Sequence, residues 1–75
     1  MKARPLQERI GDALRKRREA RKYSQEGFAD HIKMHRAYYG AIERGKKNVQ
    51  LTTLERVCDG LEVSMWEVIR EAETR

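Results

Sequence analysis

The stretch 36–44 combines cationic and small side chains in a pattern that suits contact with a rigid, electron-rich partner. At about 100° per residue, one face of a helix carries five of these residues: Arg36, Ala37, Gly40, Ala41 and Arg44. Tyr39 and Ile42 lie on the opposite, apolar face. A guanidinium donates two parallel hydrogen bonds to a phosphate or to the O6 and N7 atoms of guanine. Because small neighbours let the backbone approach closely, Arg36 is the candidate base-reading residue.

Further polar residues in and around this stretch suit contact with nucleic-acid backbone or base edges. They are Gln25, His35, Arg44, Lys46, Lys47 and Asn48. Gln25 begins a predicted helix, where its amide and the free backbone N–H groups suit a phosphate. The N-terminal Lys2 and Arg4 are weaker candidates for phosphate contact. For Arg36 and for each of these side chains, the alternative is an ordinary solvated surface residue.

Apolar residues recur at helical spacing through the chain, and no segment alternates apolar and polar residues as a strand does. The pattern predicts five helices, over residues 6–22, 25–32, 35–44, 51–61 and 64–73. Leu6 and Leu51 are expected in the buried stripes of the first and fourth helices. Short connections imply helices that pack around one core, so the predicted fold class is all-α.

Capping residues mark the predicted helix ends. Ser24 and Ser64 are the expected N-caps of two helices, and the glutamate three residues after Ser64 completes a capping box. Gly45 is expected to end the third helix in the left-handed conformation. For the fourth helix the cap is either Gln50 or Thr52, and Thr52 would belong to a second capping box.

Two of these helices, joined by about three residues, form a helix-turn-helix layout over residues 24–45. The chain carries several short motifs in a fixed order: Ser24-Gln25-Glu26, Phe28-Ala29, Ile42-Glu43-Arg44-Gly45, Leu54 and Leu61-Glu62-Val63-Ser64. Their order and spacing resemble the Xre-type helix-turn-helix family, which includes phage repressors of the lambda type. The stretch 35–45 is most similar to the controller proteins of restriction–modification systems.

This resemblance implies a lambda-repressor-like domain that binds double-stranded DNA sequence-specifically and regulates transcription. The second helix of such a unit lies in the major groove with its N-terminal residues at base edges. The resemblance implies that Arg36, Ala37 and Ala41 meet base edges. It also implies a phosphate contact for Gln25, and a backbone or thymine-methyl contact for Tyr38.

The resemblance also implies a structural ion pair between Glu43 and Arg18 of the first helix. Such a pair orients helices more than it stabilises them. Several positions depart from the family pattern. Lys33 replaces a frequent turn glycine, Glu62 replaces a glycine after the fourth helix, and Gly60 lies inside that helix. Gly27 replaces the usual glutamate, so no capping box closes on Ser24, and Ala37 lacks the hydroxyl that related controllers often carry. A left-handed backbone at Lys33 would cost about 1 kcal/mol. These departures predict looser helix ends.

The 75 residues support one small domain over 1–75. The net charge of +5 is uneven, with +6 over residues 1–22, +2 over 23–48 and −3 over 49–75. A basic half attracts nucleic acid or anionic membrane. No apolar run reaches the roughly 18 residues of a membrane span, and no signal-peptide core follows the basic start. The single Cys58 is expected in the core and cannot form an internal disulfide, which suits a reducing compartment. Together these features predict a cytoplasmic protein with no membrane partner.

The last predicted helix is the expected dimer surface. Val63, Met65, Trp66 and Ile69 offer more apolar surface than a terminal helix of a small monomer usually needs. A two-fold homodimer would place two recognition helices one DNA turn apart and require a palindromic operator. The alternative is that all four side chains fill the core of their own domain.

No pattern indicates a catalytic site, a cofactor or a small-molecule ligand, so no enzyme activity is expected. His31 and His35 are four residues apart, but a turn separates them, and no metal site is expected. One alternative function is an antitoxin or other protein-interaction module in which DNA binding is secondary. Another is nucleic-acid binding without sequence preference through the basic first helix. Controller and phage-type repressor both remain open.

Overall fold

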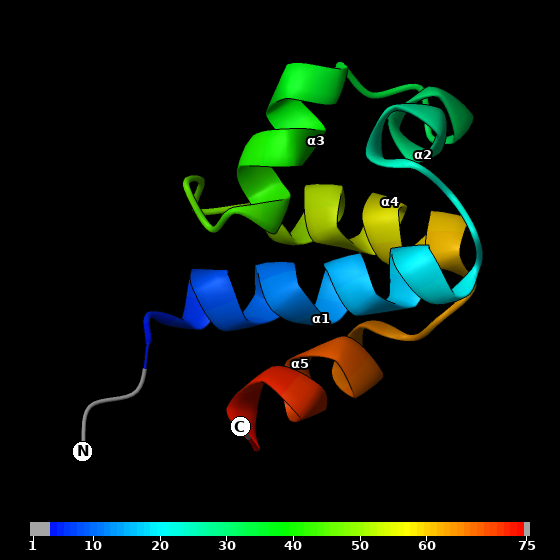
Figure 1. Ribbon diagram of the computed structural model, residues 1–75. Coiled ribbons are helices and arrows are strands. Elements are labelled where there is room, and N and C mark those ends of the chain that lie inside the picture. The colour runs from blue at the N-terminus through cyan, green and yellow to red at the C-terminus, as the bar shows by residue number, and fades with distance from the viewer. Residues whose placement is uncertain (1–3, 75) are drawn as a thin grey trace.

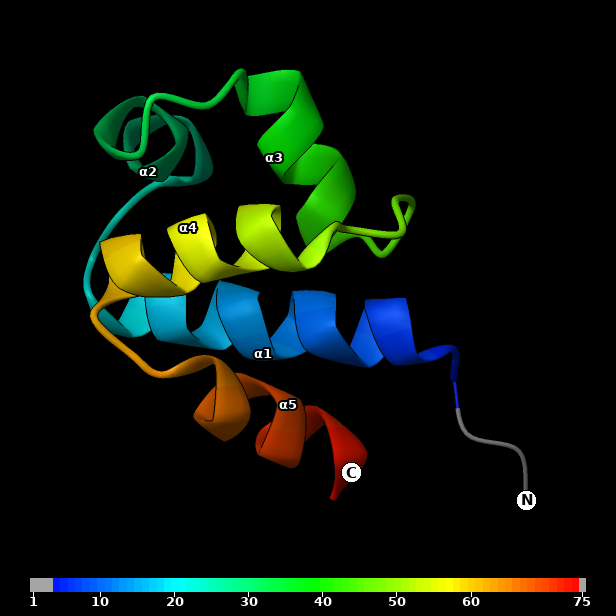
Figure 2. The ribbon, with the colours of Figure 1, turned by 180° about the vertical axis from the view of Figure 1, so that it is seen from behind.

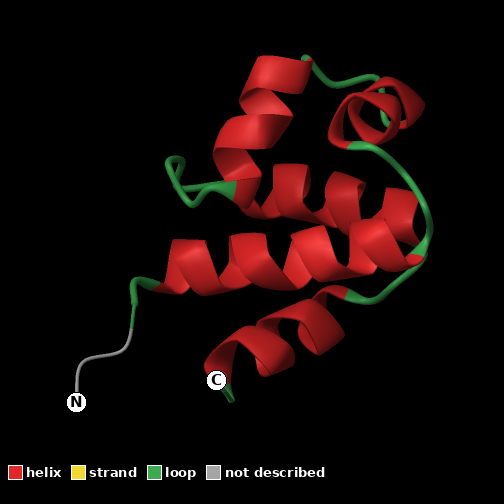
Figure 3. Ribbon diagram, in the orientation of Figure 1, coloured by secondary structure: helices red, strands yellow, loops and turns green. Residues whose placement is uncertain are grey.

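The computed structural model describes residues 4–74 and shows helices and no strand within that range (Figures 1 and 3). The elements are α1 (Leu6–Ala20), α2 (Gln25–His31), α3 (Arg36–Glu43), α4 (Leu51–Leu61) and α5 (Met65–Glu73). The prediction of an all-α domain of five helices is confirmed. α1 ends before its predicted limit because the positive φ of Lys22, 67°, takes the chain out of the helix. No helix in the described range is long and apolar enough to cross a membrane.

α1 runs through the middle of the molecule, with α2 and α3 on one side of it and α5 on the other (Figure 1). The view from behind shows α4 alongside α1 (Figure 2). All five helices contribute to one core, which includes Ile10, Ala13, Leu14, Phe28, Ala29, Tyr39, Ile42, Leu54, Val57, Cys58, Leu61, Val68 and Ala72. This arrangement leaves the first turn of α3 at one end of the molecule and α5 at the other.

Two leucines do not lie where the apolar pattern places them. Leu6 and Leu51 are 41% and 71% exposed, so the expectation that both are buried is wrong. Each is the first residue of its helix. A helical side chain leans toward the N-terminus, so a first-position side chain extends past the end of the helix and beyond the core.

Most of the predicted caps form. Ser24 Oγ accepts a hydrogen bond from the Gly27 N–H at 2.9 Å, and Ser64 forms the full capping box at the start of α5. Gly45 follows α3 with a φ of 71°, a conformation that glycine adopts without strain. The box at Thr52 is wrong, because α4 begins at Leu51 and its N-cap is Gln50, whose side chain makes no capping hydrogen bond.

The departures at Gly60 and Glu62 have different structural roles at the end of α4. A Cβ on Gly60 would lie 2.3 Å from Ile32 Cγ2, so only glycine lets the end of α2 pack this closely on α4. Glu62 takes the left-handed conformation, with a φ of 59°, and forms the C-cap of α4. Gly60 therefore lies in a closely packed part of the fold, whereas the Glu62 side chain is 71% exposed, and the looser helix ends stay a prediction.

The turn between α2 and α3 is held by a side chain from α4. Lys33 has a φ of 56°, the left-handed conformation considered from the sequence. The Arg56 guanidinium donates to the Ile32 carbonyl from Nε at 3.0 Å and from Nη2 at 2.6 Å, and Nη2 also donates to the Lys33 carbonyl. Arg56 thus satisfies the carbonyls that the end of α2 leaves unpaired.

Replacing Arg56 by alanine is expected to lower the free energy of unfolding by about 2 kcal/mol, because two carbonyls lose a charged donor. Urea-induced unfolding measures this loss. Lys33→Gly in the same background should recover about 1 kcal/mol, since glycine adopts a positive φ without strain. Arg15→Ala, which removes an exposed arginine of α1, is the control. Equal losses for Arg56→Ala and Arg15→Ala would show that Arg56 does not hold the turn.

Candidate nucleic-acid interface

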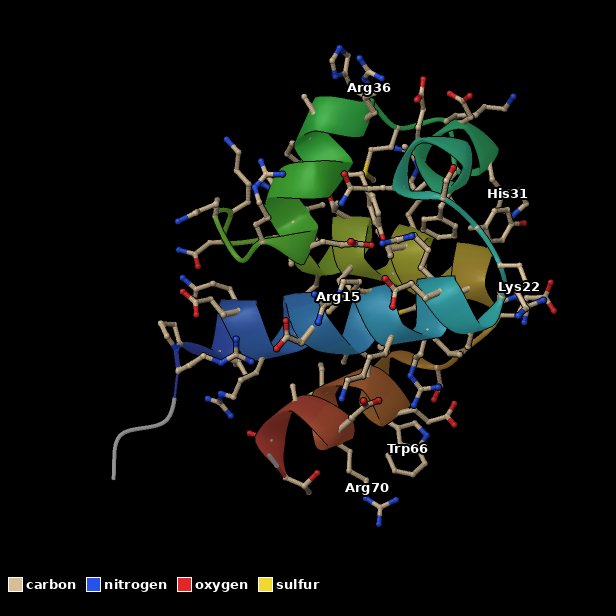
Figure 4. All side chains as sticks on the ribbon, in the orientation of Figure 1. Arg15, Lys22, His31, Arg36, Trp66 and Arg70 are labelled. Carbon is tan, nitrogen blue, oxygen red and sulfur yellow. The ribbon has the colours of Figure 1, made fainter. Side chains whose placement is uncertain are left out.

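The first turn of α3 forms an exposed tip made of four consecutive residues: His35, Arg36, Ala37 and Tyr38. Arg36 is the first residue of α3, its side chain is 68% exposed, and it projects from the end of the molecule (Figure 4). His35, expected as the first helical residue, is instead the N-cap. Its Nδ1 accepts a hydrogen bond from the Ala37 N–H at 3.3 Å. The structure thus brings these four predicted site residues together.

An acidic residue that the sequence analysis did not single out lies beside Arg36. Arg36 Nη1 is 3.1 Å from Glu26 Oε1, and both side chains are about two-thirds exposed. Glu26 belongs to the first turn of α2, so this ion pair connects the starts of the two helices of the helix-turn-helix unit.

The predicted exposed face does not extend to Gly40 and Ala41, which are buried, and contact of either residue with DNA stays a prediction. Every residue from Tyr39 to Glu43 is buried, because α1 and α2 cover the second half of α3. A Cβ on Gly40 would lie 3.1 Å from both Gln25 Oε1 and Arg44 Nη1, so these two side chains cover it. The exposed surface of α3 is therefore its first turn together with Arg44 at its end.

The predicted pair of Arg18 and Glu43 is formed and buried, with the residues 7% and 6% exposed. Arg18 donates from Nε to Glu43 Oε2 at 2.6 Å and from Nη2 to Glu43 Oε1 at 3.1 Å. Two further donors complete the set, the Tyr39 hydroxyl to Oε2 at 2.6 Å and Gln25 Nε2 to Oε1 at 3.0 Å. One carboxylate thus ties together α1, α2 and α3.

The electrostatics of this cluster keep Glu43 ionised. Burial alone would raise the pKa of Glu43, but hydrogen bonds from Arg18, Tyr39 and Gln25 outweigh it and leave the pKa lowered. Burial and the hydrogen bond to Glu43 raise the pKa of the Tyr39 hydroxyl. The hydrogen bond to Glu43 raises the pKa of Arg18. These hydrogen bonds hold the C-terminal end of α3 against α1 and α2; we call this buried cluster the polar joint under α3.

Gln25 is half-buried; its amide nitrogen donates one hydrogen bond to Glu43, and its Oε1 lies close to Gly40. The remaining phosphate candidates, Arg44, Lys46, Lys47 and Asn48, are exposed at the end of α3 and in the loop before α4. Arg44 and Lys46 line an open groove between α1 and α3.

Of the two N-terminal candidates, only Arg4 belongs to the part of the chain that the structure describes. Arg4 lies at the edge of the same groove and is paired with Asp12. Lys2 lies outside the described residues. The basic character near α3 thus comes from the loop after it and from Arg15, which also lines the groove.

The four residues expected at a dimer surface fall into two groups. Val63, Met65 and Ile69 are half-buried and pack against the core of their own chain. Trp66 is 62% exposed, and the Arg70 guanidinium lies 5.6 Å from the centre of its ring. Figure 4 places Trp66 and Arg70 at the end of the molecule opposite Arg36.

The surroundings of His31 and Cys58 indicate structural roles for both side chains. His31 stacks on Tyr23 with 5.2 Å between ring centres, and among the described residues no three ligating side chains gather into a metal site. Cys58 is 1% exposed, as expected for a core residue. Burial, with a smaller contribution from Asp59, raises the pKa of its thiol to about 11.

Comparison with known proteins identifies the family. A family model described as a helix-turn-helix domain matches residues 9–70. The chain belongs to this helix-turn-helix domain family. Control protein C.MunI from Mycoplasma sp is 42% identical over 66 residues, which cover 87% of this chain and 89% of that protein. The resemblance to controller proteins seen in the sequence is confirmed.

Solved helix-turn-helix structures agree with the fold described above. The clp gene regulator ClgR from C. glutamicum superposes with a TM-score of 0.91 at 30% identity, covering 97% of this chain and 94% of that one. The restriction-modification controller protein C.Esp1396I, solved as a tetramer with its natural 35 base-pair operator, superposes with a TM-score of 0.80 at 28% identity. That match covers 95% of this chain and 99% of the C.Esp1396I chain.

Proposed function

We propose that this chain is a transcriptional regulator that binds operator DNA sequence-specifically through the first turn of α3. The observation that carries the proposal is the exposed Arg36 at the tip of a helix-turn-helix unit. The second helix of this unit is held at its C-terminal end by the hydrogen bonds of Glu43. The function class is a DNA-binding regulator rather than an enzyme, and we place it in the cytoplasm, where it meets DNA.

In the proposed complex the tip formed by residues 35–38 enters the major groove. The Arg36 guanidinium donates to O6 and N7 of one guanine, and Ala37 and Tyr38 face the neighbouring base edges or backbone. Because Gly40 and Ala41 are buried, we assign base reading to this single turn. The phosphate contacts come from the residues around it: Gln25, Arg44, Lys46, Lys47 and Asn48.

The relatives narrow the biological role. C.MunI is a control protein, and C.Esp1396I is a restriction-modification controller solved on its operator. The 42% identity to C.MunI over most of both chains supports a controller role in a restriction–modification system. ClgR is a regulator of clp genes, so a control or regulatory role is common to the relatives named here.

A homodimer built through α5 fits this role, because a two-fold axis presents two α3 tips to a palindromic site. Replacing Trp66 by alanine is expected to raise the dimer dissociation constant at least about tenfold, since exposed tryptophans are frequent interface hot spots. Folding should survive, because 62% of Trp66 is exposed. Sedimentation equilibrium measures the dissociation constant. Leu51→Ala, which shortens an exposed apolar side chain of α4, is the control. An unchanged dissociation constant in Trp66→Ala would show that α5 does not form the dimer interface.

In-vitro selection from random DNA duplexes at near-physiological salt tests the proposed function. We expect enrichment of a palindrome with two half-sites about one helical turn apart. If no sequence is enriched, the proposal that this chain binds operator DNA sequence-specifically is wrong. A protein-binding role of the antitoxin kind would then replace it.

A further inference from the structure

The base-reading candidate Arg36 is held by a neighbour. Arg36 Nη1 and Glu26 Oε1 are 3.1 Å apart, and Figure 4 shows Arg36 at the exposed end of the unit. A guanidinium carries several N–H donors in a planar fork, so one carboxylate oxygen on Nη1 leaves Nη2 and Nε available. The ion pair therefore holds the Arg36 guanidinium beside the start of α2 and leaves donors free for a base.

Both ends of this ion pair come from fixed backbone. Glu26 lies in the first turn of α2, next to the Ser24 cap, where Oγ accepts from the Gly27 N–H at 2.9 Å. Arg36 follows His35, whose ring caps α3. The pair thus joins two capped helix starts.

The charge at the tip is balanced within the pair. Among residues 24–27 and 35–38, the only formally charged side chains at neutral pH, with histidine neutral, are Glu26 and Arg36. The cations that suit phosphate binding lie elsewhere, in the loop carrying Arg44, Lys46 and Lys47. A carboxylate facing DNA is repelled by phosphates, so Glu26 lowers affinity for DNA in general. It also competes with phosphates for the long, flexible arginine.

We propose that Glu26 is a specificity-determining positioning residue that keeps the Arg36 guanidinium aimed at a base edge and away from the phosphates. This inference rests on the proposed function, since it requires Arg36 to read a base. Without Glu26, Arg36 adopts more rotamers and binds the DNA backbone of any sequence. The carboxylate thus exchanges general affinity for selectivity.

A double-mutant cycle on selectivity tests this proposal. Affinities of the wild type, Glu26→Gln, Arg36→Ala and the double variant are measured for the duplex enriched by the wild type. They are also measured for the same duplex with the Arg36-dependent base pair exchanged. Glu26→Gln should raise affinity for the exchanged duplex about threefold. The selectivity ratio is the affinity for the enriched duplex divided by the affinity for the exchanged duplex. Glu26→Gln should reduce this ratio about fivefold to tenfold, because the bidentate contact is no longer preorganised.

In the Arg36→Ala background, Glu26→Gln should change both affinities equally and leave the ratio unchanged. Glu55→Gln, which removes the same charge from an exposed residue of α4, is the matched control and should keep the wild-type ratio. The urea midpoint of Glu26→Gln should equal that of the wild type, since an exposed pair contributes little to folding.

Two results would overturn the inference, and they are distinguishable. If Arg36→Ala reduces selectivity while Glu26→Gln leaves it unchanged, Arg36 reads a base and Glu26 does not direct it. If Arg36→Ala itself leaves selectivity unchanged, the proposed reading site fails, and the inference fails with it.

Discussion

Replacing Arg36 by alanine is expected to reduce discrimination at one base pair in each half-site by about tenfold to a hundredfold. A bidentate arginine–guanine contact is worth about 1–3 kcal/mol of discrimination, and the exposed first turn of α3 offers no other arginine. Binding itself should persist, because Lys46, Lys47 and Arg44 still face the DNA backbone. Parallel selections with the two proteins, followed by titration of the enriched duplexes, measure the effect.

Arg15→Ala is the matched control for this prediction. It removes an exposed arginine from the groove between α1 and α3, so it should weaken binding to all duplexes alike and make binding less sensitive to salt. An Arg36→Ala protein that enriches the wild-type sequence with undiminished selectivity would contradict the assignment of Arg36.

Glu43→Gln is expected to lower the free energy of unfolding by about 3–5 kcal/mol. The change leaves the buried Arg18 guanidinium with only the exposed Glu19, 3.9 Å away, as a counter-charge, and a poorly paired buried charge is costly. It also weakens the contacts from Tyr39 and Gln25 that fix the base of α3. A domain of this size has roughly 5–15 kcal/mol of stability, so a large fraction is lost. Urea-induced unfolding followed by circular dichroism measures it.

The control for Glu43 is Glu55→Gln, an exposed change expected to stay within about 0.5 kcal/mol of the wild type. A loss of similar size in both variants would show that the buried cluster contributes no more than a surface carboxylate. A large loss for Glu43→Gln alone would support the polar joint under α3.

The stabilising effect of Glu43 should depend on pH in one direction. Its folded-state pKa lies below the unfolded value, so its contribution is fully present above the unfolded pKa. It is lost as the pH falls through the lower, folded value. Unfolding free energies measured from neutral to acidic pH should therefore fall less steeply in Glu43→Gln than in the wild type. Parallel curves would contradict a lowered pKa.

Much of the fold follows from local signals in the sequence. Helix ends are marked locally at Ser24, Gly45 and Ser64. The two serine side chains accept hydrogen bonds from backbone N–H groups a few residues on, and the glycine adopts the left-handed conformation that ends a helix. Arg18 and Glu43 are 25 positions apart, and their pairing came from the family resemblance rather than from spacing. Thr52 has the residue type of a cap, but the local pattern does not show that the helix already begins at Leu51.

The predicted site was less accurate because a helical projection ignores what covers a helix along its length. Gly40 and Ala41 share a face with Arg36, yet they lie one turn deeper, where neighbouring helices bury them. Glu26 was missed because it meets Arg36 only after the turn brings the starts of α2 and α3 together. The signal that could have found it is the opposite charge at the second position of one helix and the first of the next.

The most direct test of the central claim replaces the guanine expected to contact Arg36 by 7-deazaguanine, which lacks the N7 acceptor. If the tip of α3 reads this base in the major groove, the wild type should lose about tenfold in affinity for the modified duplex. Arg36→Ala should bind the modified and unmodified duplexes equally. Equal binding of both duplexes by the wild type, at each guanine of the half-site in turn, would contradict base reading by Arg36.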